Sequence, residues 1–255
     1  MIVAVMIIAG LEVCKAVGNK FEKPLAVIVV VFCLVGYAVF LAVHLGFGSG
    51  GITAFLAVLA LFAIAVLVIR VFSRQHTRRL FGTIFVLVYP VSILVYLLAL
   101  NYLTDDVRVT AIALAFLISS FTDVMAFAVG STLKGPKLMP SVSPKKTVSG
   151  AIGGLAGGVM AAMIVMALGY FEVLQMSPLD PRVGFNVLHF VIFGLAGAFC
   201  NQAGDLIASY IKRSCEIKDY GSVLPGHGGV MDRVDGLMVT AVFVYLYMAV
   251  LVMFM

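Results

Sequence analysis

The chain has 255 residues, of which 63% are hydrophobic and 11% are charged, and its mean hydropathy is +1.16. Soluble domains carry about 25% charged residues, so this composition excludes a large soluble domain and indicates a membrane protein. The formal net charge of +5 is explained by membrane orientation, which gathers lysine and arginine in cytoplasmic loops, and predicts no nucleic-acid partner. Four cysteines without a CxxC pair predict neither a metal knuckle nor a disulfide framework.

Apolar runs long enough to cross a bilayer, about 20 residues each, divide the chain into eight expected spans. They cover residues 1–14, 25–44, 52–72, 81–100, 107–129, 150–171, 185–210 and 237–255. The first span is the shortest, and no basic region or cleavage site marks it as a removable signal peptide. No internal repeat is visible. The sequence therefore predicts an all-α polytopic membrane bundle of about eight transmembrane helices.

Basic residues alternate from loop to loop along these spans. All lysines and arginines except Arg108 and Arg182 fall at the loops after the first, third, fifth and seventh spans. The positive-inside rule places these loops in the cytoplasm and both termini outside. We expect residues 1–106 to be supporting helices and 107–255 to be the catalytic region, whose cytoplasmic loops 130–149 and 211–236 are longer than orientation requires.

Two carboxylates stand within or at the end of apolar spans, Asp123 and Asp205. A charged residue at the centre of a span costs about 2.5–3.5 kcal/mol on insertion scales, so such residues usually face a cavity, a partner or an ion. Helix rise places Asp123 about 24 Å and Asp205 about 30 Å from the outer ends of their spans, toward the cytoplasmic edge. For Asp123 alone, simple pairing at the interface is an equal alternative.

A polar stripe begins one turn before Asp205. Its members, spaced for one helix face, are Asn201, Asp205, Ser209, Lys212 and Arg213. Carboxylate oxygens bind hard cations and cationic side chains bind phosphate oxygens, so the stripe suits a metal-bound phosphate. Taken alone, it is better explained as a positive helix end whose polar residues face solvent.

The loop before the last span is rich in glycine and charge. Gly226-His227-Gly228-Gly229 allows close backbone approach to a ligand, and Asp232, Arg233 and Asp235 follow within one turn. Carboxylates at a helix start are also ordinary caps. Lys218 and Asp219 add to the charge of this loop, and the composition favours a functional site.

The other long loop, 130–149, contains several prolines and serines, which predict an irregular structure. Lys145 and Lys146, with Ser143 and Thr147 beside them, have the groups needed to hold phosphate oxygens. Taken alone, the loop is equally well explained as a basic loop that sets orientation.

The segment from Ser209 to Asp235 resembles the signature of the phosphatidate cytidylyltransferases, also called CDP-diglyceride synthases. The matching pattern is a serine, lysine-arginine, lysine-aspartate, Pro-Gly-His-Gly-Gly and Asp-Arg-x-Asp. Ser143-Pro-Lys-Lys-Thr147 and Gly204-Asp205-Leu206 resemble two further elements of that family.

This resemblance implies a reaction of CTP with phosphatidate that gives CDP-diacylglycerol and pyrophosphate, with Mg²⁺ as cofactor and K⁺ as a second candidate ion. It implies a site that faces the cytoplasm in a bacterial inner membrane, next to the membrane lipid; a homodimer is left open. No general base is required, because a phosphate monoester is largely ionised at pH 7.

The resemblance also implies residue roles. Asp205 and Asp232 would bind the metal. Phosphates would be held by Ser209, Lys212, Arg213, Lys218 and Arg233, with Lys145 and Lys146 from the other loop. The orienting groups would be Asp123, Asp219, His227 and Asp235.

Four positions depart from the family pattern. Val148 and Ser149 stand where Trp-Glu is common, Ala208 replaces a glutamate, and Gly236 replaces a serine. These departures bear on substrate preference and turnover more than on reaction type. Alternatives are a CTP-dependent transferase acting on an isoprenoid alcohol or ether lipid, a relative that binds CTP without turnover, and a membrane transporter. A transporter usually places its site at the membrane midplane, often between repeated halves.

Overall fold

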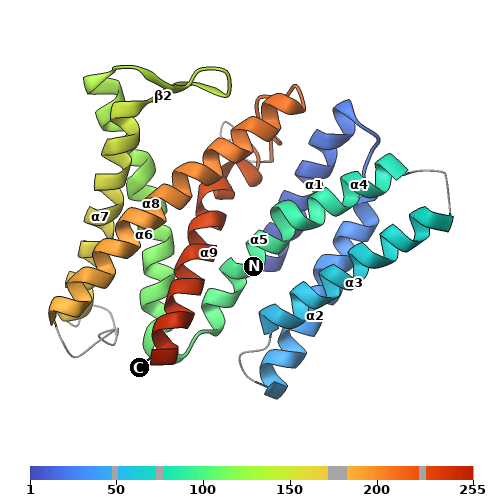
Figure 1. Cartoon of the computed structure of the whole chain (residues 1–255), viewed down its shortest axis with the longest axis horizontal. Coiled ribbons are helices and arrows are strands. Elements are labelled where there is room, and N and C mark those ends of the chain that lie inside the picture. Colours follow the sequence, from blue (N-terminus) through green and yellow to red (C-terminus); the bar gives the residue numbers. More distant parts are fainter. Residues whose placement is uncertain (48–50, 73–76, 172–182, 224–227, 255) are drawn as a thin grey trace. The chain divides into compact units, whose positions relative to one another are not determined.

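The computed structural model describes residues 1–47, 51–72, 77–171, 183–223 and 228–254, and their side chains at 1–46, 51–64, 79–104, 107–171, 186–223 and 228–252. The helices of these parts are α1 Ile2–Lys20, α2 Ala26–Phe47, α3 Gly51–Phe72, α4 Thr77–Val86, the π-helix η1 Leu87–Val91, α5 Ser92–Ala99, the 3₁₀-helix η2 Leu100–Tyr102, α6 Asp105–Leu133, α7 Val148–Tyr170, α8 Val183–Ser214 and α9 Met231–Phe254. Two strands, β1 Lys137–Met139 and β2 Ser143–Thr147, lie between α6 and α7 (Figure 1).

The prediction of an all-α polytopic bundle is confirmed. Seven helices of the described chain are long and apolar enough to cross a membrane, and Gly51–Ile64, the part of α3 whose side chains are described, is a shorter apolar helix. Each of the eight expected spans corresponds to one helical segment, with α4, η1 and α5 together forming the fourth. The chain is an integral membrane protein.

Several helix ends differ from the expected spans. The first helix is not short, because α1 continues through Lys20, and α9 begins at Met231 rather than at residue 237. Both additional segments carry charged residues that interrupt the apolar run while remaining helical. Hydropathy therefore predicts the apolar part of a helix that crosses the lipid, whereas the helix continues beyond it into a charged segment.

The loop 130–149 is not irregular as expected. β1 and β2 form an antiparallel hairpin, in which Lys137 pairs with Thr147 and Met139 with Ser143. A hydrogen bond from the Val142 N–H to the Met139 carbonyl closes the turn at 3.2 Å. The prolines are tolerated because a two-stranded ribbon has only edge strands.

The chain divides into two compact units, Met1–Ala99 with Ile211–Val234, and Leu100–Tyr210 with Asp235–Met255. We call them the first and the second unit. The first unit contains α1 to α5 and also the signature segment 211–234. The expected division at residue 106 concerned supporting and catalytic roles, and it stays a prediction.

In the first unit, α1 packs against α2, α4, η1 and α5. Met6, Ala9 and Val13 of α1 are fully buried. The fourth span is interrupted at η1, where Pro90 follows Tyr89, whose backbone is not helical. Proline lacks the N–H that an α-helix requires, which explains the break.

In the second unit, α6 and α7 run side by side (Figure 1). Glycines spaced for one face of α7 allow this approach: a Cβ at Gly153 would lie 2.5 Å from Val129 Cβ, and one at Gly157 would lie 2.6 Å from the Phe121 carbonyl oxygen. Small residues at such spacing let membrane helices approach closely. Gly158 does the same toward α8, at 2.5 Å from Ala198 Cβ. The hairpin and the polar residues of α6 and α8 are thereby brought together.

Candidate functional site

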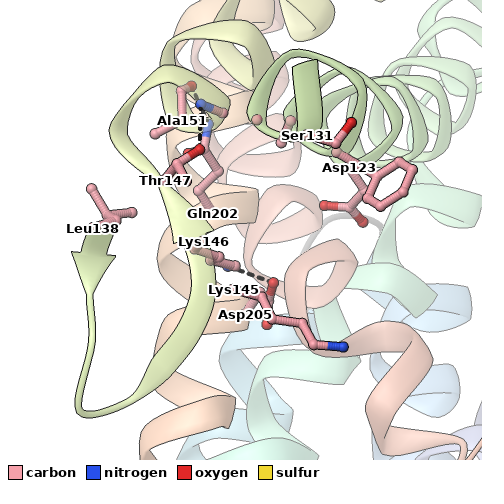
Figure 2. Close-up of a pocket in the computed structure, with 13 residues that line it drawn as sticks. Asp123, Ser131, Leu138, Lys145, Lys146, Thr147, Ala151, Gln202 and Asp205 are labelled. Carbon is pink, nitrogen blue, oxygen red and sulfur yellow. Dashed lines mark hydrogen bonds and ion pairs between the residues drawn. The ribbon is translucent and has the colours of Figure 1, made fainter. Parts of the chain in front are cut away.

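A cavity of about 310 Å³ opens in the second unit between α6, the hairpin, α7 and α8. Figure 2 shows the charged and amide side chains that line it: Asp123 of α6, Lys145 and Lys146 of β2, and Gln202 and Asp205 of α8. The two predicted carboxylates and the two predicted lysines therefore line one cavity, although they come from three elements.

Asp205 is paired with Lys146. The lysine Nζ lies 2.5 Å from Asp205 Oδ2, and the two side chains are 27% and 31% exposed. Ser209, one turn further along α8, donates a hydrogen bond to Asp205 Oδ1 at 3.3 Å. The ion pair thus connects Asp205 of the polar stripe with Lys146 of the loop 130–149, two elements that the sequence predicts separately.

Asp123 is held by a buried amide. Asn201 Nδ2 donates to Asp123 Oδ1 at 2.8 Å, and Ser119 Oγ donates to Asn201 Oδ1 at 2.7 Å. Asn201 is fully buried. The chain Ser119–Asn201–Asp123 fixes the orientation of the carboxylate, because each donor has one partner within the network.

The hairpin is anchored to the helices at both of its ends. Thr147 is the N-cap of α7, where its Oγ1 accepts from the Gly150 N–H at 3.1 Å, and the Val148 N–H donates to the Pro136 carbonyl at 3.0 Å. Ser149 Oγ donates to the Lys134 carbonyl. The lysines of β2 are thus carried on a segment fixed at the ends of α6 and α7, whereas Ser143 lies at the hairpin turn and is not among the residues that line the cavity.

A second cluster lies in the first unit around Asp232. Lys212 Nζ lies 2.8 Å from Asp232 Oδ1, and the backbone N–H groups of Tyr220 and Gly229 donate to Oδ2 at 2.8 and 3.0 Å. Lys212 also lies over the Tyr220 ring, with Nζ 5.5 Å from its centroid. An ionised carboxylate offers about four lone-pair positions. Three donors from the described residues occupy Asp232 in this arrangement.

The other residues of the signature take several positions. Arg213 and Arg233 are exposed, and the Arg213 guanidinium donates to the Ile217 carbonyl at 3.3 Å. Asp235 Oδ1 accepts from the following backbone N–H at 2.8 Å. Lys218 and Asp219 are exposed, and His227 lies outside the described residues. Phosphate binding by Arg213, Lys218 and Arg233 stays a prediction, and so do the orienting roles of the other three residues.

The donor chemistry fits a magnesium ion at the cavity of the second unit. In the described residues no group of three or more His, Cys, Asp or Glu side chains gathers at one point. Magnesium, however, is commonly held by one or two carboxylates together with substrate phosphates, and Asp123 and Asp205 supply two. Asp205 and Asp232 belong to different units, so the expectation that they share a metal stays a prediction.

The loop after α8 has two groups with altered pKa values. Hydrogen bonding and charge interaction with Lys20 hold the pKa of Glu216 below its ordinary value, across a 2.8 Å ion pair. Burial raises the pKa of the Cys215 thiol, although nearby Lys20 opposes this shift. Lys20 of α1 therefore acts on both residues at the start of the signature loop.

The sequence profile of the cytidylyltransferase family matches residues 1–251. The chain belongs to the cytidylyltransferase family. This finding confirms the resemblance drawn from the signature segment, and it extends the match to the N-terminal helices.

Proteins named phosphatidate cytidylyltransferase are similar to this chain. The one from Brucella abortus biovar 1 (strain 9-941) is 41% identical over 145 residues, which are 55% of this chain and 47% of that protein. The one from Rickettsia typhi is 36% identical over 152 residues, 60% of this chain and 62% of its own length. The one from Rickettsia conorii is 34% identical over 157 residues, 62% and 64% respectively. The matched region is thus less than two thirds of each of these relatives.

Two polar residues beside the candidate clusters were missed in the sequence. Glu12 is a buried carboxylate within the first apolar helix and accepts hydrogen bonds from the Val230 and Met231 N–H groups. The rule that drew attention to Asp123, an acidic residue within a span, applied equally to Glu12. Gln202 donates to the Ala151 carbonyl at 3.1 Å. It gave no such signal, because it is uncharged and does not belong to the polar stripe.

Proposed function

We propose that this chain transfers a cytidylyl group from CTP to phosphatidate and releases pyrophosphate. A phosphate oxygen of phosphatidate forms a bond to the α-phosphorus of CTP, and the bond from that phosphorus to the oxygen bridging to the β-phosphate breaks. The product is CDP-diacylglycerol. The names of the relatives support this substrate pair, and the family supports the transferred group.

The observation that carries the proposal is the cavity where Lys146 pairs with Asp205 and where Asp123 and Lys145 also contribute. Both substrates are anions, so their encounter requires cations at the reacting phosphates. Lys145 and Lys146 supply two positive charges at one wall. Asp123 and Asp205 provide carboxylate oxygens for Mg²⁺, which when bound neutralises phosphate oxygens and aligns them.

The Asp232 cluster supports the same chemistry from the first unit. Lys212 at the end of α8 and Arg233 in the first turn of α9 are cationic groups of this segment, and two backbone N–H groups point toward Asp232. Such a combination of glycine-rich backbone and cationic side chains suits phosphate oxygens. We assign Lys212 and Arg233 to phosphate binding, with Arg213 and Lys218 as further cations of this segment.

The same proposal includes location. The basic residues of the hairpin and of the signature segment favour the cytoplasmic side of the membrane, where CTP is found. The bacterial relatives favour a bacterial plasma membrane. Phosphatidate would enter from the lipid leaflet beside the helices.

The test is a transfer assay on the full chain, purified in detergent, with labelled CTP, phosphatidate and Mg²⁺. The expected product is lipid-linked label that disappears with a chelator. Asp205→Asn and Asp123→Asn should each lower kcat/KM by at least about a hundredfold, as expected when charge stabilisation at a reacting phosphate is lost. Lys137→Met, which removes an exposed lysine of the same hairpin, is the matched control and should retain activity.

Other lipid acceptors separate the remaining alternatives. Label transferred to an isoprenoid alcohol or an ether lipid, and not to phosphatidate, would overturn the substrate assignment but retain cytidylyl transfer. CTP binding without label in any lipid would favour a relative that lacks turnover. Full activity in both aspartate variants would contradict the cavity as the reaction site.

A further inference from the structure

Glu12 is an acidic side chain in the middle of α1, with 6% of its surface exposed. Its two carboxylate oxygens accept hydrogen bonds from consecutive backbone N–H groups, Oε1 from Val230 at 3.0 Å and Oε2 from Met231 at 2.8 Å. All three residues belong to the first unit. A carboxylate from the first span therefore satisfies the N–H groups at the start of the last one.

The surroundings of this carboxylate leave it little room. A Cβ added at Gly229 would lie 2.6 Å from both Glu12 oxygens, and one at Gly221 would meet Oε1 at still shorter range. Real Cβ atoms do not approach oxygen so closely. The two glycines thus form a cradle that the Glu12 carboxylate fills, and any side chain at either position would displace it.

The contact fixes the residues that lead into Asp232. Val230 also accepts from the Arg233 N–H at 3.0 Å, which closes the first turn of α9. Asp232 accepts from Gly229, one residue before the two that Glu12 binds. A local cap of this helix is already present in Asp232, so Glu12 adds a second attachment from a different helix. Its effect reaches the residues assigned above to phosphate binding.

We propose that Glu12 is a positioning residue of the cytidylyl-transfer reaction. By holding the backbone of Val230 and Met231, it keeps Arg233, and Asp232 with its partner Lys212, in the arrangement that binds phosphate. This inference rests on the proposed function. It also gives α1 a direct role in positioning the signature segment, beyond that of a supporting helix.

Two variants test the contact from opposite sides. Glu12→Gln keeps the size of the side chain, but its amide nitrogen faces an N–H group and one acceptor is lost. Gly221→Ala leaves the Glu12 side chain itself unaltered, but its added methyl group pushes the Glu12 carboxylate away from Val230 and Met231. Glu22→Gln, an exposed acid just after α1, is the control with the same change of charge.

The first measurement is backbone amide exchange in detergent, followed by mass spectrometry of peptides across the whole chain. We expect peptides that contain Val230 and Met231 to exchange about tenfold faster in Glu12→Gln and in Gly221→Ala, because a hydrogen bond to a charged group is lost. Peptides from α2 and from the second unit should be unchanged. Exchange identical to that of the unaltered chain would overturn the proposal, and so would a uniform increase throughout the first unit, which indicates general destabilisation.

The second measurement is the transfer assay with labelled CTP and phosphatidate. Both variants should lower kcat by about tenfold to a hundredfold, as expected for displaced catalytic groups, while the KM for phosphatidate is unchanged. A raised KM for phosphatidate with an unchanged kcat would overturn the positioning role, and so would an equal fall of kcat in Glu22→Gln. If Glu12→Gln does not fold, the same two measurements on Gly221→Ala decide whether Glu12 is a positioning residue. If the unaltered chain transfers no label, the proposed function fails, and amide exchange still decides whether Glu12 holds this segment.

Discussion

Lys212 at the end of α8 and Asp232 in the first turn of α9 form an ion pair of 2.8 Å, with side chains only 12% and 9% exposed. The pair closes the signature segment on itself within the first unit. Ion pairs exposed to solvent contribute little to stability, whereas removal of one partner from a buried pair leaves an uncompensated charge. This contact is therefore expected to matter for folding as well as for phosphate binding.

Lys212→Met should destabilise the chain by about 3 kcal/mol, because Asp232 loses its cation while it stays buried. The measurement is denaturant or thermal unfolding in detergent, with Lys15→Met as the control for an exposed lysine. The double variant Lys212→Met with Asp232→Asn should be less destabilised than Lys212→Met alone, since no unpaired charge remains and the amide oxygen still accepts from the Tyr220 and Gly229 N–H groups. A double variant that is worse than the single one would contradict this reasoning.

Gly236→Ser restores the residue that is usual in the family, yet we expect it to be harmful in this chain. A Cβ at Gly236 would meet Asn201 Oδ1 at very short range and the Asn201 carbonyl oxygen at 3.0 Å. Asn201 would have to move, and its hydrogen bond to Asp123 would weaken. Overpacking of this kind costs about 1–3 kcal/mol.

The measurement for Gly236→Ser is unfolding together with the transfer assay, and both stability and kcat should fall. Gly46→Ser is the matched control, because a Cβ at Gly46 meets nothing within 4 Å. A stable Gly236→Ser variant with normal turnover would show that Asn201 does not need its present position. This glycine would then be an unexplained departure from the family.

Lys146→Met should raise the KM for CTP and lower kcat, because it removes a cation from the cavity and leaves Asp205 without its partner. A pair that is partly exposed to solvent contributes little to folding, so the melting temperature should change by far less than the activity. Lys137→Met on the neighbouring strand is the control. Equal kinetics of the two variants would contradict the assignment of Lys146 to the site.

Much of the fold could be predicted because bilayer thickness dictates it. All eight apolar runs became helical segments, and the polar stripe from Asn201 to Lys212 lies along α8 as its spacing indicated. The ends could not be read from hydropathy, since the first turn of α9 is charged and is satisfied by Glu12 and Asp232. The hairpin was missed because its prolines and serines are equally common in irregular loops.

The candidate site was predictable in residue types but not in its contacts. The pairing of Lys146 with Asp205 and of Lys212 with Asp232 joins residues far apart in sequence, and no periodicity encodes it. Asn201 was noticed only as a member of a stripe, although it orients Asp123. Gly221 gave no signal and Gly236 was noted only as a departure from the family, because the reason for each glycine is a side chain contributed by another helix.

The ion pair of Lys20 with Glu216 should make stability depend on acid pH. Lys20 holds the pKa of Glu216 below its ordinary value of 4.5, by hydrogen bonding and by charge. A lowered pKa in the folded state means that the pair contributes fully above pH 4.5 and that this contribution is lost as pH falls through the lowered value. Lys20→Met should therefore have a slightly lower melting temperature than the unaltered chain at neutral pH, and the difference should vanish in stronger acid.

Because the pair is exposed, about 1 M salt, where the Debye length is about 3 Å, should also remove the difference. A difference that persists at low pH and in high salt would assign the effect to packing of the Lys20 side chain, and Lys15→Met on the same helix controls for the loss of a charge.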